Sequence, residues 1–393
     1  MKRFILYVAL AGYAFANSVA YERALEHNPQ LRGLYAQLQA LETEVTLASL
    51  WENPTLALEV MDIPFDKPLT RNQEMQSESI SLTQVIPTGS KRTHAATLAR
   101  QEVEIKALEI VQQRLWLALQ IGVLEQKHWQ LTRDLALTKE ALALLDTLLA
   151  LRLSYNATSS QFSQSVALTL SQKTLEVEKR TLERAQATLV RELEQVVGTF
   201  ASFSPTDTGI LPFAFKVGVE DISSNPQLQA ALLKSRQGQT LVALEASQKT
   251  PDVMLKLGYN RREGKRDDGF LEVGFSLPLY GRETLRTHKA HFAQTALDEE
   301  ATALRQRLTF ELHDTLLERQ LQEEKIALYR ALVAQSETLY AVLEETAFSQ
   351  PQSLPSLLEA LQTQLEAKKL LSEAVYGHNA AVLQMRYLLG VLP

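Results

Sequence analysis

An internal repeat is the feature that most constrains this 393-residue chain. The tetrapeptide Asn28-Pro-Gln-Leu recurs at Asn225, 197 positions later. Other markers keep matched spacing: Pro54 and Pro251 each follow the repeated Asn-Pro proline by 25 residues, and 109 residues separate Gly89 from Gly198 and Gly281 from Gly390. Such periodic self-similarity indicates a tandem duplication. We therefore predict two structural repeats, residues 17–209 and 210–393.

Each repeat contains a pair of alternating segments, in residues 54–87 and 251–278. In the second repeat, apolar positions alternate with small or polar ones; the apolar set is Val253, Leu255, Leu257, Tyr259, Leu271, Val273, Phe275 and Leu277. Period-two alternation predicts β-hairpins with one apolar face. At about ten residues each, tilted strands would cross a hydrocarbon layer. Aromatic residues near the strand ends could form interfacial girdles or simply pack locally: Trp51, Phe65, Phe270 and Tyr280.

The rest of each repeat has helical spacing. A helix of about thirty residues is expected to begin near Ser18 and near Asp221, and long helices are expected over roughly 90–153 and 284–347. A 64-residue helix is about 96 Å long. The helical pattern breaks near 155–160 and 348–355, where Pro351 would end a helix, and shorter helices return over about 161–197 and 357–389. The lengths predict two short helices stacked end to end beside each long one.

Composition excludes several classes of function. With no cysteine, the chain has no disulfide, no thiolate metal site and no lipid-bearing cysteine. The formal charge is −6 without a basic cluster, so we expect no nucleic-acid partner. We identify no catalytic constellation, and expect neither an enzyme nor a cofactor or metal site.

The first residues have the pattern of a secretory signal. Lys2 and Arg3 precede an apolar run from Phe4 to Phe15, and Ala14-Phe-Ala16 has the small-x-small form of a cleavage site. We predict a signal peptide over residues 1–16, with cleavage after Ala16 or after Ala20. The chain is therefore expected to be exported.

Four strands with two free edges cannot lie alone in a bilayer, because the edge N–H and C=O groups would have no hydrogen-bond partner. Closure into a barrel requires several copies of the chain. Two copies would give eight strands and an interior filled by side chains, whereas three would give twelve strands and a lumen. A conduit favours the homotrimer. The alternative is a periplasmic helical scaffold or tether without a pore.

Over nearly its whole mature length the sequence resembles the TolC-like outer-membrane efflux proteins. The similarity is carried by the two Asn-Pro-Gln-Leu starts, by the strand openings at Pro54 and Pro251, and by the segments Ser81-Leu-Thr-Gln-Val-Ile-Pro-Thr-Gly-Ser-Lys-Arg92 and Gly274-Phe-Ser-Leu-Pro-Leu-Tyr-Gly-Arg282. The resemblance implies a mainly α fold with a four-stranded β contribution, assembled as a trimeric 12-stranded β-barrel in the outer membrane and a 12-helix barrel in the periplasm.

The resemblance also implies a passive conduit for small solutes or metal ions. Its partners would be outer-membrane lipid, a periplasmic adaptor protein and an inner-membrane pump of the RND or ABC type. The segments Asn53–Glu59 and Glu78–Arg92 are most similar to the outer-membrane components of heavy-metal (cobalt–zinc–cadmium) efflux systems. An outer-membrane channel for type I protein secretion is the alternative within this fold.

The same resemblance suggests site residues near the helix turns. Relatives often carry two aspartates at the periplasmic entrance, at positions that correspond here to Ser356 and Glu359. Glu359 is thus a candidate gate or selectivity residue, and an exposed helix glutamate is the alternative. The candidate residues for docking the adaptor lie in the turns: Asn156, Thr158 (where the family often has Gly), Ser159, Gln350 and Gln352.

Overall fold

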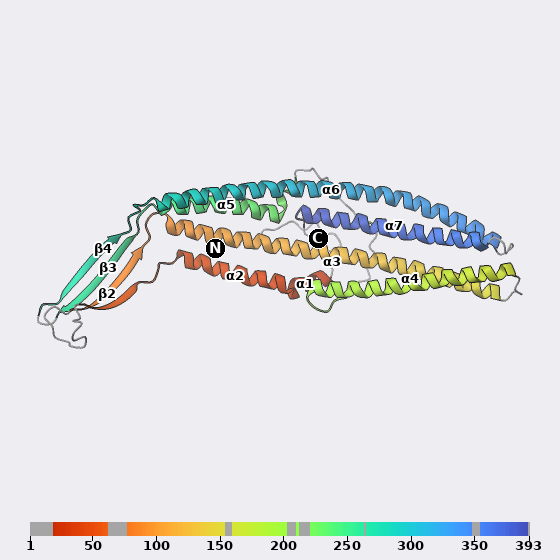
Figure 1. Ribbon diagram of the computed structural model, residues 1–393, viewed down its shortest axis with the longest axis horizontal. Coiled ribbons are helices and arrows are strands. Elements are labelled where there is room, and N and C mark those ends of the chain that lie inside the picture. Colours follow the sequence, from red (N-terminus) through yellow and green to blue (C-terminus); the bar gives the residue numbers. More distant parts are fainter. Residues whose placement is uncertain are drawn as a thin grey trace. The chain divides into compact units, whose positions relative to one another are not determined.

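The computed structural model describes residues 19–61, 77–153, 159–202, 210–211, 221–262, 265–347 and 354–391. Within these ranges the elements are α1 (Val19–His27), α2 (Pro29–Ser49), β1 (Thr55–Met61), β2 (Ser77–Ile86), α3 (Lys91–Leu153), α4 (Ser159–Val197), the 3-10 helix η1 (Asp221–Ser224), α5 (Pro226–Ser247), β3 (Val253–Arg262), β4 (Asp268–Phe275), α6 (Arg282–Ala347) and α7 (Leu354–Leu388). Figure 1 shows these helices and most of the strands. The predicted fold class, long helices with two β-hairpins, is confirmed.

The chain divides into two compact units. The helical unit comprises Met1–Gly33, Ile110–Leu228 and Arg305–Pro393, and the sheet unit comprises Leu34–Glu109 and Gln229–Leu304. Each unit contains residues of both sequence repeats. The repeats follow one another along the chain, whereas the boundary between the units falls within the long helices α3 and α6.

The sheet unit contains one antiparallel sheet with strand order β1-β2-β3-β4. The two expected hairpins are β1 with β2 and β3 with β4. Between them, β2 pairs with β3 over ten residues, from Ser77 opposite Arg262 to Ile86 opposite Val253. This seam, which joins strands from different repeats, was not part of the sequence prediction.

In the helical unit, the expectation of one continuous first helix is wrong. Asn28 separates α1 from α2, and in the second repeat only the short η1 precedes α5. The reason is the Asn-Pro pair. Proline restricts the residue before it but suits the first position of a helix, and the Asn28 and Asn225 side chains accept the backbone N–H groups of Leu31 and Leu228 as N-caps.

The same two asparagines join the short helices end to end. Asn28 Nδ2 donates to the carbonyl of Val196 at 2.8 Å, and Asn225 Nδ2 donates to that of Leu388 at 2.9 Å. Each side chain thus satisfies one unpaired donor of the helix that begins and one unpaired carbonyl of the helix that ends. The duplicated Asn-Pro motif is therefore a helix-stacking joint.

A glycine with positive φ completes each joint. Gly198 follows α4 with φ 82°, and Gly390 follows α7 with φ 70°. A Cβ on Gly198 would lie 3.0 Å from the carbonyl oxygen of His27, and one on Gly390 would lie 2.5 Å from that of Ser224. Glycine is required both for the left-handed backbone and for the close approach of the next helix.

The stacked short helices lie beside the long ones, as the lengths predicted. In the helical unit, Gln30 of α2 and Gln172 of α4 bond to α3 through Gln113 and Asp146. Contacts from α5 and α7 to α6 include Ser235 with Asp298 in the sheet unit and Lys368 with Glu337 in the helical unit. Figure 1 shows α5 and α7 along α6.

A leucine cluster near the far ends of the helices forms part of the core of the helical unit. Leu145, Leu168, Leu358 and Leu361 are buried against one another and bring α3, α4 and α7 together. No helix in the described ranges is long and apolar enough to cross a membrane. The predicted signal peptide lies outside the described residues.

Candidate functional site

One face of the sheet is apolar and open. Leu58 is 77% exposed, Leu257 63% and Leu271 68%, and their apolar neighbours on the same face are exposed too. Soluble monomers rarely expose so much contiguous apolar surface. The period-two prediction therefore identified this face correctly, and nothing in the described chain covers it.

The two outer strands leave free edges. Among the described residues, β1 pairs only with β2, and β4 pairs only with β3. Each outer strand therefore presents a row of backbone donors and acceptors that another strand can pair with.

The opposite face of the sheet is polar, and the structure places Phe270 on it. Phe270 pairs with Gly258, which pairs with Ser81. The ring lies against Gly258 so closely that a Cβ there would collide with it. The structure thus favours local packing over an apolar-face girdle for Phe270. Trp51 instead stacks with Arg92, whose guanidinium carbon lies 5.1 Å from the ring centroid.

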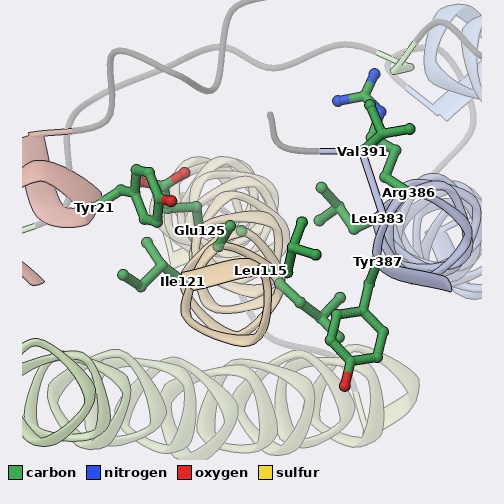
Figure 2. Close-up of a pocket in the computed structure, with 11 residues that line it drawn as sticks. Tyr21, Leu115, Ile121, Glu125, Leu383, Arg386, Tyr387 and Val391 are labelled. Atoms are coloured by element: carbon green, nitrogen blue, oxygen red, sulfur yellow. The ribbon is translucent and has the colours of Figure 1, made fainter. Parts of the chain in front are cut away.

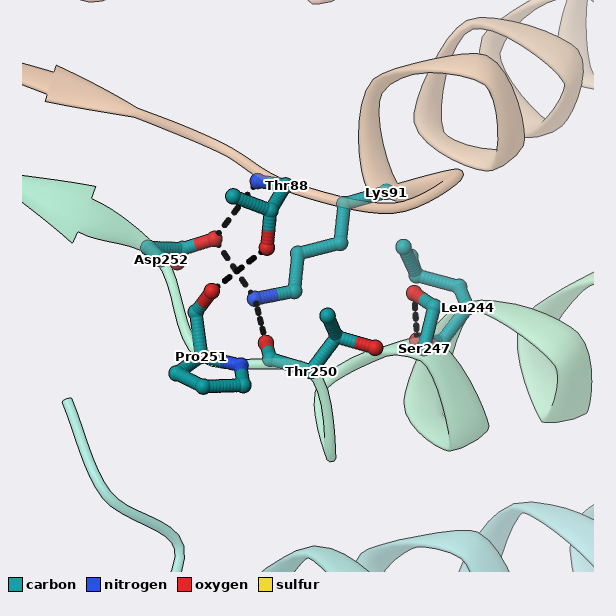
Figure 3. Close-up of polar contacts among 7 residues, drawn as sticks. All are labelled: Thr88, Lys91, Leu244, Ser247, Thr250, Pro251 and Asp252. Carbon is teal, nitrogen blue, oxygen red and sulfur yellow. Dashed lines mark hydrogen bonds and ion pairs between the residues drawn. The ribbon is translucent and has the colours of Figure 1, made fainter. Parts of the chain in front are cut away.

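A polar clasp ties the two repeats together where the strands meet the helices (Figure 3). Lys91 Nζ donates to the carbonyl of Thr250 and to Asp252 Oδ1, both at 2.7 Å. The backbone N–H of Thr88 donates to the same carboxylate oxygen at 3.0 Å, and its hydroxyl donates to the carbonyl of Pro251. The Lys91 side chain is only 9% exposed, whereas that of Asp252 is 32% exposed, so the ammonium is shielded from water and the carboxylate is partly open to it. Sequence analysis missed this ion pair, although Lys91 lies in the segment that carried the family resemblance.

The long helix α6 carries an exposed apolar stripe in the helical unit. Its members recur at alternating steps of seven and four: Phe310, Leu317, Leu321, Leu328, Leu332 and Leu339. Eleven residues make close to three helical turns, so these side chains stay on one face of a straight helix. The stripe is a second surface that the single chain leaves uncovered.

The predicted gate residues are described, but most of the predicted docking residues are not. Ser356 and Glu359 are both exposed on α7, while Leu357, Leu358 and Ala360 beside them are buried. Asn156, Thr158, Gln350 and Gln352 lie outside the described residues, and Ser159 is described only as the first residue of α4. The long helices end at Leu153 and Ala347, where the sequence pattern breaks.

A small pocket in the helical unit lies between α3 and α7 (Figure 2). Leu115, Leu119 and Leu383 supply apolar lining, and Glu125 and Arg386 add charged groups. Burial lowers the pKa of Arg386 from its usual value. The apolar lining continues into a core cluster of Leu119, Leu211, Val382 and Leu383, which indicates helix packing rather than a reactive site.

Two buried polar side chains of the helical unit, Asp134 and Asn379, are paired across helices. Asp134 of α3 accepts from the hydroxyl of Ser372 in α7, and burial raises the pKa of the Asp134 carboxyl. Asn379 donates to Gln126 at 2.7 Å and accepts from the backbone N–H of Leu211. Asn379 therefore also holds Leu211, near the start of the second repeat. Within the described ranges, no group of three or more His, Cys, Asp or Glu could hold a metal ion.

No protein-family model matches the sequence, and no curated protein matches it. Solved structures do. A structure of CusC, from a study of its folding and transmembrane channel formation, matches with a TM-score of 0.80 at 13% identity, covering 95% of this chain and 91% of that one.

Two other solved structures are similar. The outer membrane protein VceC of Vibrio cholerae has a TM-score of 0.78 at 16% identity, with 95% of each chain covered. The open-state MtrE outer membrane channel of Neisseria gonorrhoeae has 0.77 at 14%, covering 95% of this chain and 88% of that one. The chain therefore shares the fold of these proteins over 95% of its length.

Proposed function

We propose that this protein is the outer-membrane channel subunit of a tripartite export system, working as a passive homotrimeric conduit. The observation that carries the proposal is the sheet: one face is exposed and apolar, and both outer strands have free edges. A hydrocarbon layer would cover the apolar face, and strand pairing between copies would close the edges. Three copies would supply twelve strands.

The helices support the same assembly. The stripe on α6 from Phe310 to Leu339 is exposed in the single chain, and its spacing suits packing against a helix of a neighbouring copy. A periplasmic scaffold without a pore could use this stripe, but it has no use for an apolar sheet face. The likeness to CusC, VceC and MtrE supports the channel over the scaffold.

The first experiment measures assembly and conduction together. The detergent-solubilised protein should have the mass of a trimer by light scattering and should form pores in planar bilayers. As a control, Leu58→Lys and Leu271→Lys would put charges on the proposed lipid face, where each costs about 2–4 kcal/mol at the bilayer midplane. These variants should insert poorly. A monomer that leaves bilayers sealed would refute the proposal.

The helix turns at the end of α3 and α6 are the proposed docking surface for the adaptor. The support is that both long helices end, at Leu153 and Ala347, at equivalent points of the repeat. Single cysteines at Ser159 and Gln350 should crosslink to the adaptor, with the cysteine-free wild type as background. Labelling of these cysteines from outside intact cells would reverse the proposed orientation.

Glu359 is the proposed selectivity residue at this end of the channel. Its exposure beside the buried Leu358 and Ala360 leaves the carboxylate outside the packed core of the single chain. Three such carboxylates around a narrow opening would attract cations; Ser356 would add no second charge. Glu359→Gln should weaken cation selectivity without affecting trimer formation, and an unchanged reversal potential would place Glu359 away from the lumen.

Heavy-metal ions are the proposed cargo, with an RND-type or ABC pump as the partner that supplies energy. This rests on the sequence segments Asn53–Glu59 and Glu78–Arg92, which also contribute to the sheet. Deleting the gene in its native host should lower tolerance to cobalt, zinc or cadmium. If tolerance to organic toxins fell instead, the channel would be assigned to solute efflux; loss of a secreted protein would assign it to type I secretion.

A further inference from the structure

The polar face of the sheet contains a set of side chains that the proposed conduit does not by itself explain. Adjacent strands place Glu59, Ser79, Asn260 and Asp268 in one row across the sheet. The next row is Ala57, Ser81, Gly258 and Phe270. The first row carries oxygen ligands in every strand, and the second is small except for one aromatic ring.

Lys256 extends across these rows. In the sheet register, Lys256 is opposite Thr83 of β2 and Glu272 of β4, and Thr83 is in turn opposite Thr55 of β1. The Lys256 Nζ nevertheless lies 3.5 Å from a carboxylate oxygen of Glu59, which is four residues further along β1 than Thr55. The ammonium also lies 5.7 Å from the centroid of the Phe270 ring. The Lys256 side chain is 22% exposed. A lysine side chain that was simply solvated would point away from the sheet, whereas the Lys256 side chain lies along its polar face.

Beneath these side chains are oxygen atoms with unused hydrogen-bonding capacity. Ser79 is 5% exposed and Ser81 2%. Their hydroxyls, and the Asn260 side-chain oxygen, are buried without a hydrogen-bond partner in the described part of the chain. Phe270 covers Gly258, which is the cross-strand partner of Ser81. Lys256 extends to Glu59, which is the cross-strand partner of Ser79. Buried oxygens of this kind are costly unless something binds to them.

We propose that this face of the sheet is a small-cation site in the channel wall, with Lys256 as its tethered resident cation. The ammonium is paired with Glu59, and the Ser79 and Ser81 hydroxyls and the Asn260 oxygen, which have no partner among the described residues, would be further ligands for a cation that replaces it. The Phe270 ring lies within cation–π distance of the ammonium, and Gly258 has no Cβ that would collide with this ring. The inference rests on the proposed function, because it requires the polar face to line the lumen.

In this proposal, Lys256 controls how strongly the pore prefers cations over anions. With Lys256 on Glu59 that pair is neutral, and among Lys256, Glu59 and Glu272 only Glu272 leaves a negative charge in each copy. When the ammonium is removed, Glu59 and the nearby Glu272 stay uncompensated in each copy. A water-filled pore with low-dielectric walls focuses such a field, so cations should then pass more readily and divalent ions should bind.

The test uses single-channel recording with a KCl gradient. Lys256→Gln should raise the K⁺ over Cl⁻ permeability ratio severalfold and introduce block by Mg²⁺, whereas Lys256→Arg should behave like the wild type. Glu59→Gln should shift the ratio the other way. Glu59→Gln also removes only the partner, so it remains informative if the Lys256 variants fail to assemble.

Cysteine chemistry adds a test within one channel. The chain has no native cysteine, so Lys256→Cys offers a thiosulfonate reagent a single target. Attaching an aminoethyl group should restore the wild-type reversal potential during the recording. Open pores whose selectivity is the same in Lys256→Gln, Glu59→Gln and the wild type would overturn the cation site while leaving the conduit intact. A wild type without pores would instead overturn the proposed function.

Discussion

The helical unit and the sheet unit use their apolar side chains in opposite ways. In the helical unit, Leu193 and Leu312 are fully buried, and Leu145 is 1% exposed. In the sheet, Leu58 and Leu271 point outward and are largely exposed. Burial contributes about 25 cal/mol per Å², so a single chain stabilises its helical unit with its own core. The sheet obtains that contribution only from surfaces outside the chain.

The helical unit and the sheet also differ in whether their buried polar groups have hydrogen-bond partners within the chain. The helical unit pairs Asn379 with Gln126 and Asp134 with Ser372. The sheet buries the hydroxyls of Ser79 and Ser81 without a protein partner in the described residues. The helical unit pairs these groups within the chain but leaves the α6 stripe exposed. The sheet has a composition that suits a lipid layer on one side and an aqueous lumen on the other.

The largest test of this contrast truncates one leucine in each unit. Leu312→Ala should lower the free energy of unfolding by about 2–5 kcal/mol, because it leaves a cavity in a packed core. Leu58→Ala, on the exposed face, should cost the detergent-solubilised protein less than about 1 kcal/mol, since detergent fills the space. Guanidinium titration followed by circular dichroism measures both. Equal losses would contradict the contrast.

A second test compares two glycines with nearly the same backbone. Gly390 has φ 70° and Gly281 has φ 68°, but only the first has a neighbouring backbone atom where a Cβ would lie. Gly281→Ala should cost about 1–2 kcal/mol for the left-handed conformation. Gly390→Ala should cost about 1–3 kcal/mol more for the overlap with Ser224. If the two variants have the same free energy of unfolding, the joint between α7 and α5 accommodates the added Cβ more easily than its geometry indicates.

The third test concerns the clasp in the sheet unit. Lys91→Met should lower stability by about 2 kcal/mol, because the buried ammonium no longer donates to Asp252 and to the carbonyl of Thr250. The control is Lys173→Met, since Lys173 forms an exposed pair with Glu176 three residues along the same helix; that pair should contribute little to stability because water screens it. Heat denaturation of both variants gives the comparison. A Lys91 effect no larger than the control would make the clasp incidental.

Much of the fold was predictable because the same pattern of markers occurs in both repeats of the sequence. The spacing from Gly89 to Gly198 and from Gly281 to Gly390 marked the ends of the long and return helices, and all four glycines have positive φ. The strand alternation identified the apolar face. The break at Asn28 was missed because the apolar pattern continues across it, and only the capping chemistry of Asn-Pro could have indicated it.

Contacts between distant segments were beyond a single sequence. The β2–β3 seam, the Lys91–Asp252 clasp and the reach of Lys256 to Glu59 join residues more than 150 positions apart. One local signal was available: Gly258 in the middle of a strand marks the close approach of another group, which here is Phe270. The gate assignment of Glu359 came only from resemblance and stays a prediction.

The smallest expected effect is a pH dependence that belongs to the helical unit alone. Burial raises the pKa of Asp134 above its ordinary value of 3.8, against the opposing influence of Ser372 and Lys369. The protonated form is therefore favoured by folding. Its contribution to stability is complete below pH 3.8 and is lost as the pH rises through the raised pKa of the folded state.

Asp134→Asn removes this titration but keeps an oxygen that can accept from Ser372. Relative to the wild type, the variant should thus gain stability as the pH rises from about 4 to 7. The measurement is the difference in unfolding free energy between variant and wild type at each pH. A difference that stays flat, or that falls with pH, would mean that Ser372 and the nearby lysines outweigh burial and hold Asp134 charged.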